Sequence, residues 1–293
     1  MSLRDSDCIH RFVFEHTDVR GELVHLDASW RAVLERQDYP PPVRDLLGQA
    51  LAAAALLSAT IRIEGSLQLQ IQGNGPVKLL LVEVTARRTV RGLAHWQGDV
   101  AAGPLSRQVG EAARLTMTID PGQGSDRYQG LVLVERDTLA ASLEDYFRRS
   151  EQLDTRLWLA ADAQRAGGML LQRLPGRRAD DDDWNRDVFL GETLSGKELL
   201  QLTARDLLHR LYHEEDVRLF DAEPISFRCT CSAERTETML RGLGYDEVRD
   251  ILEEQGRVSV SCEFCRQEYV YDAVDVERMF AAADQPEVPS TRH

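Results

Sequence analysis

The sequence predicts an α+β protein with three consecutive parts: an N-terminal core with a largely antiparallel sheet and helices, a helical linker, and a small C-terminal domain that contains most of the cysteines. Three observations lead to this prediction. Apolar and polar residues alternate in short segments of the first 177 residues, as in half-buried strands. Acidic residues outnumber basic ones sharply after that point, and four of the five cysteines follow residue 228.

The core elements follow from local patterns. Leu67, Leu69 and Ile71 alternate with serine and glutamine, which predicts a strand over 66–72. Three prolines at 40–42 separate two helices, and the leucines and alanines that follow predict a buried helix over 43–60. Turns are expected at 73–76 and 121–124. The remaining predictions are strands at 8–16, 19–27, 77–85, 89–96, 115–120, 128–135, 156–161 and 169–174, and helices at 28–37 and 139–149.

The distribution of charged residues divides the chain into three regions. Residues 1–177 carry 21 basic and 22 acidic side chains, residues 178–228 carry 7 and 13, and residues 229–293 carry 7 and 14. We therefore predict a core domain at 1–177, an acidic linker at 178–228 and a C-terminal domain at 229–293, with a turn at 175–179 as the first boundary. The four aspartates 180–183 are interpreted as a solvated loop.

The linker is expected to be helical. Ser195 and Glu198 have the spacing of a capping box. Apolar residues at 200, 204, 207, 208 and 211 then predict one amphipathic helix. Its apolar face either packs on the protein's own core or becomes exposed under some condition, and the pattern leaves both open.

Length and composition exclude several classes. With 293 residues, 43% of them hydrophobic, the chain can bury a sizeable core. A formal charge of −14 argues against nucleic-acid and membrane partners. The N-terminus lacks a signal-peptide pattern, and the longest apolar stretch, 50–59, is too short to span a bilayer, so a cytoplasmic location is expected.

The cysteine spacing predicts a metal site. Cys229-x-Cys231 and Cys262-x-x-Cys265 form two close pairs with 30 residues between them. Four thiolates satisfy tetrahedral Zn²⁺ without another ligand. Closing the intervening loop costs about 3 kcal/mol, whereas structural zinc contributes about 10–16 kcal/mol in small modules. We therefore predict one zinc ion per chain, bound to Cys229, Cys231, Cys262 and Cys265 in the reduced state.

The residues alone leave the role of this site open. A constitutive structural zinc site is one interpretation. A redox switch is the other, because the members of each close pair can also join in a disulfide, which would release the metal and its folding energy. Cys8, in a predicted strand, is expected to be a buried apolar residue. No catalytic set is found in the sequence, so the protein is not expected to be an enzyme.

Several stretches resemble the heat shock protein 33 family, the redox-regulated 33 kDa chaperonins of bacteria. The resemblance covers essentially the whole chain. In the C-terminal part it rests on FRCTCS at 227–232, LG at 243–244, CEFC at 262–265 and YVY at 269–271. In the core it rests on ALLSAT at 55–60, IQGNGP at 71–76, YFRRSEQ at 146–152 and AGGMLLQ at 166–172.

The resemblance implies an ATP-independent holdase that is inactive while reduced and zinc-bound. It further implies that oxidation forms the disulfides Cys229–Cys231 and Cys262–Cys265, that zinc leaves, and that the linker unfolds. The implied partners are unfolding client proteins, a second copy of the chain in an active homodimer, and ATP-dependent chaperones downstream. Asn74, where the family commonly has an acid, is a small departure. The acidity of residues 178–293 leads us to expect that added salt slows activation, because it screens self-repulsion in the opened segment.

Other classes are weaker on this sequence. A zinc-ribbon protein with constitutive structural zinc, acting as a binding module, is the main alternative. A zinc-ribbon nucleic-acid binder is disfavoured by the net charge of −7 over residues 229–293. A dithiol oxidoreductase using Cys262 and Cys265 would leave the first cysteine pair unexplained and lacks the expected βαβ unit.

Overall fold

The computed structural model describes residues 6–61, 64–122, 126–175 and 181–281. The chain forms two compact units, residues 1–228 and 229–293. The first unit includes the predicted linker, whose standing as a separate region stays a prediction. In the described part of the chain, no helix is both long and apolar enough to cross a membrane.

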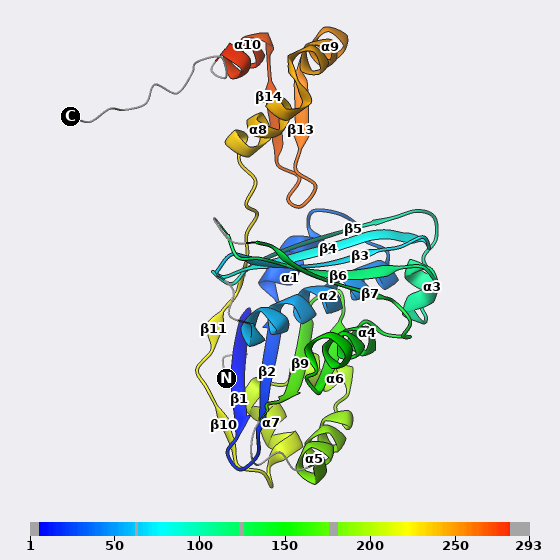
Figure 1. Ribbon diagram of the computed structural model, residues 1–293, viewed down its shortest axis with the longest axis vertical. Helices are drawn as coiled ribbons and strands as arrows, with labels where there is room; N and C mark the ends of the chain where they lie inside the picture. Colours follow the sequence, from blue (N-terminus) through cyan, green and yellow to red (C-terminus); the bar gives the residue numbers. More distant parts are fainter. Residues whose placement is uncertain (1–5, 62–63, 123–125, 176–180, 282–293) are drawn as a thin grey trace, which may run out of the picture. The chain divides into compact units, whose positions relative to one another are not determined.

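Two sheets build the first unit (Figure 1). The first has the order β10-β1-β2-β9-β8, with β11 also paired to β1, and its pairs are antiparallel. It consists of β1 (Cys8–Phe14), β2 (Val19–Leu26), β8 (Thr155–Ala161), β9 (Ala166–Arg173), β10 (Val217–Leu219) and β11 (Glu223–Pro224).

The second sheet has the order β12-β5-β4-β3-β6-β7. Its pairs are antiparallel except for β12 with β5, which run parallel. The α+β class with mainly antiparallel pairing is therefore confirmed. The strands are β3 (Ser66–Gln72), β4 (Val77–Thr85), β5 (Thr89–Trp96), β6 (Arg114–Asp120), β7 (Tyr128–Leu133) and β12 (Ser226–Phe227).

Helix α2 (Pro41–Thr60) lies between the two sheets (Figure 1) and contacts strands of both. Prolines at its first positions suit a helix start, because their missing N–H groups would have no helical partner there. The small alanines from Ala50 to Ala55 let both sheets approach closely, and these residues are fully buried. The other core helices are α1 (Ala28–Leu34), α3 (Leu105–Val109) and α4 (Leu139–Tyr146).

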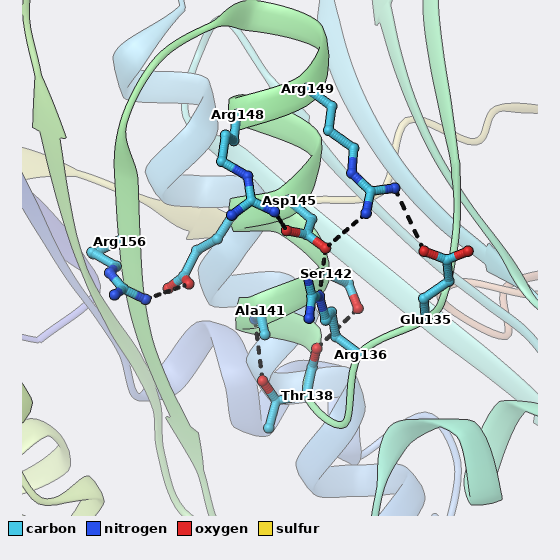
Figure 2. A network of polar contacts seen from close by, with 10 residues as sticks. Glu135, Arg136, Thr138, Ala141, Ser142, Asp145, Arg148, Arg149 and Arg156 are labelled. Atoms are coloured by element: carbon cyan, nitrogen blue, oxygen red, sulfur yellow. Dashed lines mark hydrogen bonds and ion pairs between the residues drawn. The ribbon is translucent and has the colours of Figure 1, made fainter.

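The predicted helix over 139–149 changes character near its end. α4 stops at Tyr146, and the π-helical turn η1 (Phe147–Glu151) continues the chain to Gln152, which is left-handed with φ 55°. Figure 2 shows Asp145 at the centre of a charged network around α4. Asp145 accepts hydrogen bonds from Arg136, at 2.5 Å, and from Arg148, and it pairs with Arg149 at 3.6 Å. These contacts fix the exposed side of the turn.

The prediction that the apolar residues from 200 to 211 lie on one amphipathic helix is wrong. The segment forms α6 (Gly196–Gln201) and α7 (Ala204–Tyr212), preceded by α5 (Asp181–Glu192). The capping box at Ser195 is present. The helix breaks because Leu202 is extended and the Thr203 side chain accepts a hydrogen bond from the Asp206 N–H, which caps a second helix.

The solvated-loop interpretation of the aspartates is also wrong where the structure describes them. Asp181, Asp182 and Asp183 form the first turn of α5, where carboxylates favour the positive end of the helix dipole. Asp181 pairs with Arg173 of β9 at 2.7 Å, and Asp183 with Arg186 at 3.0 Å. Asp180, the expected turn at 176–179 and the tip of the turn at 123–124 lie outside the described residues.

The linker helices cover an apolar face of the first sheet. Leu207 and Tyr212 of α7 are buried against residues of β1, including Phe14, whose ring meets that of Tyr212 edge-on at 5.0 Å. This cluster is distinct from the core around α2. Its remaining buried members are Phe12, Val19, Leu23, Met169, Leu171, Leu199, Ala204, Leu208 and Leu211. The sequence left open whether the apolar face of the linker helices is packed or exposed. In the structure it is packed against the first sheet.

The second unit is small. The two-stranded sheet of β13 (Val258–Ser261) and β14 (Glu268–Tyr271) is accompanied by α8 (Ala233–Leu243), α9 (Tyr245–Gln255) and α10 (Ala273–Ala281). Its buried core consists of Leu240, Val248, Val258, Tyr271, Val276 and Met279. A core of this size gives little stability alone, so a further source of folding energy is expected.

Candidate metal centre

Two loops of the second unit position the cysteines. Cys229 and Cys231 lie in the extended segment before α8, and the Ser232 side chain caps that helix by accepting a hydrogen bond from the Arg235 N–H. Cys262 and Cys265 lie in the loop between β13 and β14. The Cys262 N–H donates to the Gln267 carbonyl at 2.9 Å, which closes this loop next to the last strand pair.

The four sulfur atoms form one cluster. Sγ of Cys229 lies 3.6 Å from Sγ of Cys262, and Sγ of Cys231 lies 3.4 Å from Sγ of Cys265. All four lie within 4.8 Å of one another. A tetrahedral zinc site with Zn–S bonds of about 2.3 Å has sulfur–sulfur edges of about 3.8 Å. The cluster therefore has the size and the donor set that zinc requires.

The electrostatics of the cluster also favour a cation. Burial raises the pKa of the Cys229 thiol, but the Cys231 N–H and the neighbouring thiols outweigh this effect and lower the pKa to about 7. Burial, followed by the neighbouring cysteines, raises the pKa of Cys265 to about 12. The protein thus accommodates a thiolate at Cys229 readily and opposes thiolates at Cys262 and Cys265. A divalent cation removes that opposition and stabilises four thiolates together.

Further hydrogen bonds reach the sulfurs. Main-chain N–H groups donate to three of them: Cys231 to Cys229, Phe264 and Cys265 to Cys262, and Gln267 to Cys265. The fourth sulfur, that of Cys231, accepts a hydrogen bond from the side-chain hydroxyl of Tyr269 at 3.2 Å. Such donors orient metal ligands and tune their reactivity.

The structure brings together all four cysteines that the spacing predicted as ligands. Cys8 lies apart from them, in β1 of the first unit, where 7% of its surface is exposed, as expected for a buried apolar residue. Sequence reasoning missed the contact of Tyr269 with Cys231. No spacing rule reports it, because it depends on the register in which Tyr269 of β14 opposes Val260 of β13.

Comparisons with known proteins find relatives over nearly the whole chain. The family model described as Hsp33 protein matches residues 7–272. The 33 kDa chaperonin of Nitrosococcus oceani is 51% identical over 291 residues, covering 99% of this chain and 100% of that protein. That of Methylobacillus flagellatus is 48% identical over 278 residues, covering 94% of each.

A crystal structure shows the same fold. The 33 kDa chaperonin of Thermotoga maritima superposes with a TM-score of 0.82, over 95% of this chain and 100% of that one, at 22% sequence identity. The relatives are named as chaperonins, which are not enzymes, so the prediction of a non-enzyme is confirmed. The family model and the relatives together show that this chain belongs to the Hsp33 family.

Proposed function

We propose that this protein is an ATP-independent holdase chaperone that is inactive while reduced and zinc-bound and is activated by oxidation. The observation that carries the proposal is the cluster of four cysteine sulfurs in a unit whose own core is small. The chain that leads into this unit comes from helices that cover an apolar face of the first sheet. The relatives named as chaperonins support the same class of function.

Zinc would be held by Cys229, Cys231, Cys262 and Cys265. When bound, it supplies folding energy by tying the segment before α8 to the loop between β13 and β14. Structural zinc contributes on the order of 10–16 kcal/mol in small modules, which exceeds the whole stability of many domains of this size. The fold of the second unit therefore depends on the four thiolates.

Oxidation removes those thiolates. In each pair, one thiolate attacks hydrogen peroxide, the O–O bond breaks, and a sulfenic acid and hydroxide form. The second thiolate then attacks the oxidised sulfur and displaces a second hydroxide, so that two sulfurs give up two electrons and a disulfide results. We propose the pairs Cys229–Cys231 and Cys262–Cys265. The shortest sulfur contacts run between the loops, at 3.4 and 3.6 Å, so disulfide mapping is needed to test the pairing.

Unfolding of the second unit would pass directly into the linker. Cys229 follows two residues anchored in the first unit: the Phe227 N–H donates to Ser29 Oγ at 3.1 Å, and the Arg228 N–H donates to the Val90 carbonyl at 3.1 Å. Loss of these bonds would free the last residues of the linker, and the helices α5 to α7 would then detach from the first sheet. The apolar face beneath them would bind unfolding proteins.

The proposal has further parts carried by the family resemblance. The opened form would dimerise, hold clients in the cytoplasm and pass them to ATP-dependent chaperones. The alternative is a zinc-ribbon protein whose zinc is constitutive and whose second unit is a binding module. The closed loop between β13 and β14 is compatible with it. Nucleic acid is a poor partner for this unit, because its charge of −7 falls to about −9 with four thiolates and one Zn²⁺.

One experiment separates the two functions. Zinc per chain and free thiols are measured before and after peroxide at mild heat, while light scattering follows the aggregation of an unfolding client. We expect one zinc per chain before oxidation, loss of zinc and four thiols afterwards, and suppression of aggregation only in the oxidised form. The Cys8→Ala variant is the control and should respond like the unchanged chain. Zinc that stays bound while the thiols remain free would contradict the switch and leave the constitutive site.

A further inference from the structure

Tyr269 is placed to act on one particular sulfur. The residue lies in β14, opposite Val260 of β13, and its ring packs partly buried against the core of the second unit. This packing holds the ring while its hydroxyl donates to Sγ of Cys231 at 3.2 Å. The contact therefore comes from an anchored side chain whose backbone is fixed in a strand.

One donor to Cys231 is a side chain, which a single substitution can remove. Main-chain N–H groups donate to Cys229, Cys262 and Cys265, and a side-chain substitution cannot remove them. The Tyr269 donor to Cys231 is a side-chain hydroxyl. A single substitution at Tyr269 therefore removes the hydrogen bond to Cys231 while all four cysteine ligands stay in place.

A hydrogen bond to a thiolate lowers its reactivity. The O–H group draws electron density from the sulfur and occupies a lone pair that would otherwise attack an oxidant. We propose that Tyr269 is a positioning residue that slows oxidation at Cys231 and so sets the oxidant sensitivity of the switch. This inference rests on the proposed function and adds a specific determinant to it.

The step concerned is the first one at Cys231. Its thiolate attacks one oxygen of hydrogen peroxide, the O–O bond breaks, and the other oxygen leaves as hydroxide into the solvent. The resulting sulfenic acid reacts with the Cys229 thiolate, which forms the S–S bond and releases the second hydroxide. Tyr269 is neither oxidised nor consumed. Its hydrogen bond is weakened as the sulfur loses negative charge, so it stabilises the starting state more than the transition state.

The test compares two tyrosines of the same strand. Tyr269→Phe removes the hydroxyl that faces Cys231. Tyr271→Phe removes a hydroxyl that donates instead to the Ala233 carbonyl at 3.3 Å, and it serves as the matched control. Both zinc-loaded full chains are treated with excess hydrogen peroxide, and a chromophoric chelator reports the rate of zinc release. We expect Tyr269→Phe to release zinc about fivefold faster, a rate ratio of the size that one hydrogen bond of ordinary strength produces. Tyr271→Phe should stay within about twofold of the unchanged chain. An equal or slower rate for Tyr269→Phe would overturn the inference.

A second measurement separates a local effect at Cys231 from a general loosening of the second unit, which would increase the reaction of all four cysteines. The unchanged, zinc-loaded chain is partly alkylated, and mass spectrometry gives the extent of reaction at each cysteine. Tyr269→Phe should increase the reaction at Cys231 relative to Cys229, because the substitution leaves the main-chain donor to Cys229 in place. A ratio of the two reactions that is the same in Tyr269→Phe and in the unchanged chain would refute the role of Tyr269. The proposed function fails separately, if peroxide releases no zinc from the unchanged chain.

Discussion

Asp187 is a carboxyl group with no polar partner in a packed interface. It lies on α5, is fully buried, and neither side-chain oxygen has a hydrogen-bond partner in the described part of the chain. Tyr212 of α7 donates to its main-chain carbonyl at 3.2 Å. Burial raises the pKa of Asp187 to about 7, the negative charges of Glu215 and Asp183 act in the same direction, and Arg186 opposes them. Asp187 is therefore a neutral acid in the folded linker below neutral pH.

The raised pKa predicts the pH dependence of the linker. Unfolded aspartate titrates near 3.9, so the stabilisation from Asp187 is complete below about pH 4 and is lost as pH rises through about 7. The full loss between about pH 4 and pH 7 is on the order of 4 kcal/mol, of which about 2–3 kcal/mol falls above pH 5. In Asp187→Asn this part of the pH dependence disappears. The difference in Tm between pH 5 and pH 8 should be about 4–8 °C smaller than in the unchanged chain.

Tryptophan fluorescence makes this measurement specific, because all four tryptophans lie in the first unit. Asp182→Asn is the control, since Asp182 is an exposed carboxyl of the same helix and its charge is not among those that shift the pKa of Asp187. It should retain the pH dependence of the unchanged chain. A pH dependence that survives in Asp187→Asn would show that another group is responsible.

At the scale of elements, periodicity predicted most of the fold. β3, β4 and β5 have the predicted bounds, and the turn residues at 73–76 separate the first two of these strands. The break at Leu202 and the π-helical turn after Tyr146 were not predictable in this way. A threonine can occupy either the interior of a helix or its N-cap position. The packing of α6 and α7 on the first sheet selects the N-cap position for Thr203. The apolar pattern is continuous across a break that tertiary contacts create.

The candidate site divides similarly between sequence and structure. The identity of the four cysteines followed from their spacing, because few other chemistries need two close thiol pairs. The sulfur donors did not follow, since main-chain N–H groups carry no sequence signature and the Tyr269 contact depends on strand register. The predicted zinc is a property of the residue types, whereas the tuning of its ligands is a property of the fold.

The packing of the linker helices on the first sheet predicts that a variant with weakened packing exposes this sheet without oxidant. Leu207 of α7 is fully buried against the first sheet, so Leu207→Ala leaves a cavity and should destabilise the cover by about 2–5 kcal/mol. If the covered face binds clients, the reduced, zinc-loaded variant should suppress client aggregation in a light-scattering assay. Phe189→Ala, on α5 and 68% exposed, is the control and should stay inactive until oxidised. A loosened Leu207→Ala protein that remains inactive would place client binding elsewhere.

Across the whole molecule, the acidic charge of the linker is matched by basic residues of the core. Arg173 pairs with Asp181 at 2.7 Å, and Arg11 and Arg88 both pair with Glu223 at 3.0 Å. Arg88 also donates to Ser58 Oγ at 2.9 Å, which fixes its guanidinium in the core. The closed linker is therefore attracted to the core by these contacts, although residues 178–228 carry a net charge of −6.

These ion pairs reverse the salt dependence expected from linker acidity alone. Self-repulsion predicts that salt slows opening, whereas the pairs exist only in the closed form and are weakened by salt. We expect the pairs to dominate, because the opened chain can separate its charges while the closed one depends on close contacts of up to about 1 kcal/mol each. Raising NaCl from about 50 to 500 mM, roughly a threefold decrease in Debye length, should speed activation by peroxide at mild heat.

The Glu223→Gln variant tests whether the pairs are the cause. It removes the negative charge shared by Arg11 and Arg88 at the strand that leads to Cys229. The variant should activate faster than the unchanged chain at low salt and respond less to added NaCl. Activation is followed by the gain in aggregation suppression, and zinc release is recorded in parallel because the proposed mechanism places it before linker opening. If salt slows activation in both proteins, self-repulsion of the acidic segment controls opening, and the contacts of Glu223 only position the strand.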